Sequence, residues 1–144
     1  MLKKNINLLL FFIIGGLTEP NAKSWADTLF SDSTVYLYKK EDIDTSFLRL
    51  VSILKKRDLL KKANPNEKID PSSTRKDGIP DQRLILFAEN SKYRLLAFEQ
   101  GGRAHNAQVI VFHGHIFRKS ISLPGIPKDK ISLKNMLVGI HLNK

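Results

Sequence analysis

All four histidines follow residue 104, and two of them form the sharpest local pattern in the chain. His113 and His115 flank Gly114. Two side chains at positions i and i+2 of a continuous strand point to the same face, and His105 joins them if its strand is a neighbour. Three neutral imidazoles suit Zn²⁺ or Cu²⁺, so His105, His113 and His115 are a candidate metal site. If Gly114 instead forms a turn, the imidazole rings of His113 and His115 would lie at a hairpin tip and point apart.

The surroundings of these histidines argue against a resident metal. The chain has no cysteine, and no Asp or Glu lies within ten positions of His113. A metal-bound imidazole usually donates its second ring nitrogen to a carboxylate, a backbone carbonyl or water. We therefore expect no cofactor, with Zn or Cu as the alternative.

The basic side chains fall into two groups, one after a helical segment and one on predicted strands. Positive charge attracts anionic partners and speeds encounter with them. We expect the anion-binding residues to be Lys55, Lys56, Arg57, Lys61, Lys62, Arg83, Arg94, Arg103, Arg118 and Lys119. Basic groups interleaved with aromatic rings also bind nucleic acid. Arg stems that cover exposed rings give the same pattern, so nucleic acid is not favoured.

The sequence carries no recognisable catalytic motif. A cysteine nucleophile, a Gly-x-Ser-x-Gly elbow and an HExxH motif are all absent. Gly101-Gly102 lacks the third glycine and the following helix of a phosphate-binding loop. Glu89 and Glu99 are the candidate carboxylate pair, but they are expected near strand ends on opposite faces of a sheet. The sequence favours a non-enzymatic protein, and a hydrolase with an unrecognised site stays open.

The first 26 residues have the pattern of a cleavable secretory signal peptide. Lys3 and Lys4 supply the basic start. Residues 6–17 form an apolar stretch that is shorter than the roughly 20 residues needed to span a bilayer. Small side chains stand at Ala26 and two positions before it, so we expect cleavage after Ala26.

Two alternatives to this cleavage remain, a cut after Ala22 and an uncut membrane anchor. Cleavage after Ala26 would remove Trp25, the only tryptophan. The remaining residues 27–144 are enough for a single domain with one core, and no disulfide holds it. We expect this domain to be periplasmic or secreted through the general secretory route, without a transmembrane anchor.

The whole chain of 144 residues carries a formal net charge of +10. Outside the cytoplasm, such a charge favours acidic head groups or acidic proteins as partners, although it also serves solubility. The sequence predicts a small exported basic protein that binds an external macromolecule. If the producing cell lives in a host, a secreted effector fits this description. The histidine metal site is the alternative function.

Hydrophobic periodicity predicts the elements that position these residues. Residues 33–40 alternate as a short strand. Residues 45–63 have helical spacing, with Asp44 or Thr45 as the cap, and a strand through residues 47–54 is the rival. Residues 64–81 contain three prolines and few apolar side chains, which predicts a long flexible loop.

The rest of the chain is predicted to form strands. Residues 83–89 and 92–99 are expected to pair around an Asn90-Ser91 turn, which places Arg94 opposite Phe87 and Arg83 opposite Phe98. A second pair spans residues 107–113 and 115–123, and residues 130–142 hold a last strand with Gly139 as a possible bulge.

These elements predict an α+β fold in which one helix packs on a curved antiparallel sheet of four to six strands, with a small all-β barrel as the alternative. The element order is similar to that of the cystatin-like architecture. The Gln-x-Val-x-Gly motif of cystatins is missing, because Gln108 is followed by Val109, Ile110, Val111 and Phe112. The resemblance therefore implies nothing about function.

Overall fold

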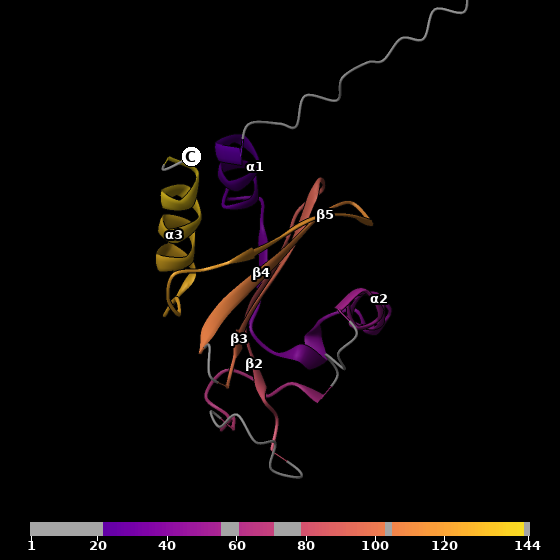
Figure 1. Ribbon diagram of the computed structural model, residues 1–144. Coiled ribbons are helices and arrows are strands. Elements are labelled where there is room, and N and C mark those ends of the chain that lie inside the picture. Colours follow the sequence, from indigo (N-terminus) through magenta and orange to yellow (C-terminus); the bar gives the residue numbers. More distant parts are fainter. Residues whose placement is uncertain (1–21, 56–60, 71–78, 103–104, 143–144) are drawn as a thin grey trace, which may run out of the picture.

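The chain folds as an α+β domain around one five-stranded antiparallel sheet (Figure 1). The computed structural model describes residues 22–55, 61–70, 79–102 and 105–142. Most of the expected signal segment, together with Lys56, Arg57 and Arg103, lies outside these residues. The strands follow one another in the order β1-β2-β3-β4-β5, and the sheet is open. The α+β prediction is confirmed and the barrel alternative is wrong.

The elements succeed one another along the chain with short connections, apart from the loop before the second strand. In order they are α1 (Ala22–Leu29), β1 (Val35–Leu37), the 3-10 turn η1 (Lys40–Asp42), α2 (Thr45–Lys55), β2 (Gln82–Glu89), β3 (Tyr93–Gln100), β4 (Asn106–His113), β5 (Ile116–Ser122) and α3 (Lys130–Leu142).

Helices cover both faces of the sheet (Figure 1). On one face α1 and α3 pack over the strands, and Leu29 and Leu133 are buried with Val109. On the other face α2 packs alone, and its Phe47 lies between Phe87 and Phe112 at ring-centroid distances of 5.3 and 5.1 Å. The sheet is thus apolar on both sides.

The predicted helix at 45–63 is confirmed in its first part, and the rival strand is wrong. Asp44 caps α2 by accepting the Ser46 N–H at 2.9 Å. The described helix ends at Lys55. Ala63 instead pairs in parallel with β2, because its N–H donates to the Gln82 carbonyl and its carbonyl accepts from Leu84.

The predicted long loop at 64–81 is anchored at both described ends. The N–H of Asp70 donates to the Pro80 carbonyl at 2.9 Å, and Gly101 donates to the Asp81 carbonyl at 2.8 Å. Asp70 is buried. Residues 71–78, on which the prediction of flexibility also rested, lie outside the described residues.

The β2–β3 hairpin has a different register from the expected one. Glu89 pairs with Arg94, and Arg83 pairs with Glu99. The reason lies in the turn, where the Asn90 side-chain oxygen accepts the N–H groups of Lys92 and Tyr93 and so lengthens the connection. A register irregularity between Leu84 and Leu86 shifts the remaining pairs. In the strand pairing both arginines therefore lie opposite glutamates rather than opposite the expected phenylalanines.

The expected last strand at 130–142 is wrong, because this segment forms helix α3. Asp129 caps the helix by accepting the Ser132 N–H at 2.7 Å, and the Ser132 hydroxyl accepts the N–H of Asp129 in return. The hydrogen bonds from Ser132 lower the pKa of the Asp129 carboxyl. Leu133 and Leu137 lie one helical turn apart and are both buried, whereas Asn135 between them is exposed. In a strand these three residues would share one face, so this burial fits a helix.

Helix α1 overlaps the carboxyl-terminal part of the expected signal segment. Trp25 is 3% exposed and Ala26 is fully buried in the core that α1 shares with α3. Cleavage after Ala26 would divide this helix, and it stays a prediction. Among the described helices, none is long and apolar enough to cross a membrane.

Candidate functional site

The β2–β3 and β4–β5 turns lie at the same end of the sheet (Figure 1). Basic and imidazole side chains contact one another there. Tyr93 pairs with His113 across β3 and β4. Gly114 adopts a left-handed backbone with φ of 60°, which favours glycine in a tight turn. Its N–H donates to the Lys92 carbonyl at 2.8 Å, which joins the β4–β5 turn to the β2–β3 turn.

Each of the two turn histidines lies against an arginine. A guanidinium nitrogen of Arg94 is 3.3 Å from Nδ1 of His115, and one of Arg118 is 3.4 Å from Nδ1 of His113. Arginine can only donate, so Nδ1 of each histidine is the acceptor in these contacts. A cation bound at these nitrogens would displace or repel the guanidinium groups.

Arg94 is the anchored member of this group. Its Nε donates to Oε1 of Glu89 at 2.5 Å, and its guanidinium carbon lies 5.4 Å from the Phe47 ring centroid. The ion pair fixes the planar fork at the surface and offsets part of its charge. Arg118 is exposed and forms no ion pair among the described residues, so it carries the accessible positive charge at this end.

Two lysines extend the positive surface along β5. Nζ of Lys55, at the end of α2, donates to the Ser120 hydroxyl at 2.7 Å. Lys119 reaches the opposite face of the sheet, where its Nζ lies 5.7 Å from the Trp25 ring. We call the whole group the basic hairpin surface, which consists of Lys55, Lys92, Arg94, His113, His115, Arg118 and Lys119.

This surface is free of acidic residues over long stretches. The segment from residue 104 to Lys128, which contains β4 and β5, has no Asp or Glu, and α2 has none either. The β4–β5 hairpin also exposes apolar side chains directly after its turn, since Ile116 is 62% and Phe117 is 43% exposed. Exposed apolar groups beside uncompensated positive charge are typical of an interaction surface.

The structure places the other predicted site residues elsewhere. Lys62 is buried, with its Nζ bound to the Gln82 side chain and 3.5 Å from the Phe98 ring centroid, and Lys61 is exposed. Arg83 belongs to a second cluster at the far end of β3. The ten predicted anion-binding residues therefore do not form one patch.

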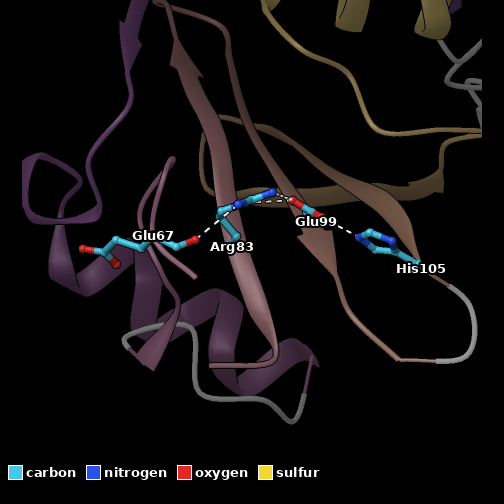
Figure 2. A network of polar contacts seen from close by, with 4 residues as sticks. All are labelled: Glu67, Arg83, Glu99 and His105. Atoms are coloured by element: carbon cyan, nitrogen blue, oxygen red, sulfur yellow. Dashed lines mark hydrogen bonds and ion pairs between the residues drawn. The ribbon is translucent and has the colours of Figure 1, made fainter. Parts of the chain in front are cut away.

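The second cluster is a network centred on Glu99 (Figure 2). The Glu99 side chain is 4% exposed and accepts from Nε and Nη2 of Arg83 at 2.8 and 2.5 Å. Its other oxygen is 2.5 Å from Nε2 of His105, whose side chain is 47% exposed. Arg83 also donates to the Glu67 carbonyl at 3.2 Å. The buried Glu99 carboxylate joins His105, just before β4, to Arg83 on β2. Arg83 in turn joins the segment of residues 61–70 to the sheet through Glu67.

The predicted histidine trio is not brought together. His105 precedes β4 and binds Glu99, while His113 ends β4 at the opposite end of the sheet. His113 and His115 each face an arginine instead of a second imidazole. Within the described residues, no cluster of three His, Cys, Asp or Glu side chains has the arrangement needed to hold a metal. The candidate carboxylate pair is not formed either, because Glu89 binds Arg94 and Glu99 binds Arg83.

Neither the Glu99 network nor the ion pair of Glu89 was predicted from the sequence. Both depend on the β2–β3 register, which placed an arginine opposite each glutamate. The signal that points to it is the pair of opposite charges near both ends of the two strands, since such pairs are favourable across a ladder.

Comparisons with known proteins give neither a family nor a function for this chain. No protein-family model, no curated protein and no solved structure matches the chain. The function of the protein is therefore inferred from the surface and the contacts described above.

Proposed function

We propose that this protein is exported and binds an acidic macromolecular partner, without catalysing a reaction, through the basic hairpin surface. The observation that carries the proposal is the absence of Asp and Glu from β4, β5 and α2, while Lys55, Arg118 and Lys119 line β5 and the end of α2. Arg94 is offset by Glu89, but Lys55, Arg118 and Lys119 form no ion pair among the described residues, and their positive charge attracts and orients an anionic partner.

The chemistry of the hairpin tip supports the same function. The planar fork of Arg118 suits a carboxylate, which it binds through two parallel hydrogen bonds. Exposed Ile116 and Phe117 add apolar area that a partner surface would cover. Charge speeds encounter and selects the sign of the partner, and the apolar residues contribute to affinity.

Export is the second part of the proposal and rests on the amino-terminal sequence. The basic start and short apolar stretch of the first 26 residues support secretion into the periplasm or beyond it. A host-directed effector role is consistent with this destination and with the small size. Fractionation of producing cells tests the proposal, and finding the full-length chain only in the cytoplasm would contradict it.

Binding to an immobilised polyanion tests the surface itself. We expect the protein to bind heparin or poly-glutamate with an affinity that falls as salt is added, because counter-ions screen and compete with the contacts. The variant Arg118→Gln/Lys119→Gln should bind about fivefold more weakly, which corresponds to two exposed ion pairs of roughly 0.5 kcal/mol each.

A control of equal charge separates a local surface from a general effect. Lys68→Gln/Lys128→Gln removes two exposed lysines outside the basic hairpin surface. It should retain most of the wild-type affinity. An equal loss in both double variants would show that net charge alone governs binding, and no binding at low salt would refute the proposed function.

A further inference from the structure

The last strand of the sheet, β5, is paired on one side only. Strand order leaves it bonded to β4, and among the described residues no strand pairs with its other side. An edge strand presents main-chain donors and acceptors to which another chain can add. Five of the seven residues of β5 are exposed, so this edge is accessible.

The alternation of hydrogen-bonded pairs between β4 and β5 shows which β5 residues point their main-chain N–H and C=O groups away from β4. Leu123 donates to the Ala107 carbonyl at 2.9 Å, which makes these two a hydrogen-bonded pair. Bonded pairs alternate in an antiparallel ladder, and the register continues to Ile121 and Lys119 as the next bonded positions. The N–H and C=O groups of Ser120 and Ser122 therefore point away from β4.

The charges around this edge determine what can add to it. Lys119 lies on the face covered by α1, and Lys55 lies on the face covered by α2, where it meets Ser120. Side chains of an added strand alternate between these two faces, so an acidic side chain on either face meets a lysine. Arg118, at the bulge in the β4–β5 pairing, adds a third positive charge at the end of the edge.

The same charges disfavour a second copy of this chain as the occupant. Pairing of two β5 edges would place Arg118 and Lys119 of one copy near those of the other, and like charges across a ladder destabilise it. Charged residues and bulges are common devices against self-pairing of edge strands. An acidic strand reverses the sign of this interaction.

We propose that an extended acidic segment of a partner protein adds to the sheet as a further strand beside β5. This inference rests on the proposed function, since it specifies how the acidic partner is held. Main-chain hydrogen bonds to Ser120 and Ser122 supply the pairing, and Lys55, Arg118 and Lys119 select for acidic side chains. Ile116 and Phe117, exposed at the hairpin tip, extend the contact beyond the strand.

Binding of a labelled peptide of Glu and Val to the full chain tests this mode. The comparison peptide has the same sequence with an N-methyl group on every residue, which keeps its charge but removes the donors on both of its edges. We expect the plain peptide to bind about tenfold more tightly, as the loss of one or two hydrogen bonds requires. Its binding should also slow hydrogen exchange at the Ser120 and Ser122 amides.

Two variants of the protein test the same edge of β5. Ser120→Pro removes an outward N–H that β4 does not use, and proline is tolerated at such edge positions. It should weaken peptide binding about tenfold. Ser120→Ala keeps the N–H, loses only the hydroxyl that binds Lys55, and should stay near wild type. If Ser120→Pro fails to fold by circular dichroism, the two-peptide comparison on the wild-type chain decides.

The outcomes separate this inference from the proposed function. Equal binding of the two peptides, with loss on Arg118→Gln/Lys119→Gln, would overturn strand addition and leave acidic-partner binding intact. Binding of anionic lipid vesicles or RNA without binding of the plain peptide would also overturn it. No binding to the peptides or to any polyanion would refute both.

Discussion

Replacement of Trp25 is a perturbation for which the structure predicts a large loss of stability. Its side chain is 3% exposed and packs in the core that α1 shares with α3 and the sheet. Truncation of a buried tryptophan to alanine costs about 3–5 kcal/mol. Because α1 is only eight residues long and lies at the margin of the core, we expect Trp25→Ala to cost about 3 kcal/mol, near the lower end of that range.

Thermal and urea unfolding of the full chain measure this effect. For a domain of this size, a loss of about 3 kcal/mol lowers the Tm by roughly 10 °C. Trp25→Phe keeps most of the apolar area and should fall between the two proteins. Ile53→Ala is the matched control, since Ile53 is exposed on α2, and it should change stability by less than about 0.5 kcal/mol.

The tryptophan also reports on its own environment. It is the only Trp in the chain, so its emission should be that of a buried indole and should shift to the red on unfolding. A change in unfolding free energy below about 1 kcal/mol for Trp25→Ala, or emission typical of water in the native protein, would refute the packing of α1. Amino-terminal sequencing of the exported protein bears on the same point, because a mature chain that begins at Asp27 would have lost this contact. If α1 belongs to the mature domain, the first residue should lie at or before Ala22.

Four further substitutions test the Glu99 network, two glycines and the Asp129 cap. Glu99→Ala should cost about 2 kcal/mol, less than a fully buried ion pair because the freed Arg83 side chain is 32% exposed. Urea unfolding measures this cost, and a neutral result would show that the network contributes no stability. Gly101→Ala should lower the Tm, since its Cβ would lie 2.4 Å from the Asp70 carbonyl oxygen, whereas Gly139→Ala, with open space in α3, should raise stability by up to about 1 kcal/mol. The same sign for both would contradict the described packing. Asp129→Ala should lower the Tm at neutral pH. Because the folded-state pKa of this carboxyl lies below its ordinary value of 3.8, its contribution is present above that pH and is lost as the pH falls through the lowered pKa. The Tm difference between the two proteins should therefore shrink below pH 3.8, and a constant difference would exclude the charged cap.

Local periodicity was sufficient for the strands of the central sheet. Alternation of apolar residues places β2, β3 and β4 within a residue or two of the predicted segments, because the two-residue period of a strand is a local property. The same holds for the start of α2, where Asp44 precedes residues at helical spacing. The acid-free stretch that ends at Lys128 is likewise evident from the sequence alone.

The errors fall where distant parts of the chain decide the outcome. In α3 the apolar residues Ile131, Leu133, Met136, Leu137 and Ile140 suit more than one period, and packing of Leu133 and Leu137 against the sheet and α1 selects the helix. The β2–β3 register followed from a side-chain hydrogen bond of Asn90 rather than from its neighbours' hydrophobicity.

The candidate site shows the same division between sequence and tertiary structure. Residue types alone predicted a basic protein and an anionic partner, because charge is a property of composition. Only the fold decided which charges act together. It buried Lys62, paired Arg83 with Glu99, separated His105 from His113, and left Arg118 and Lys119 on an open edge of the sheet. The physical reason is that burial and register depend on contacts between strands and helices that are far apart in the sequence.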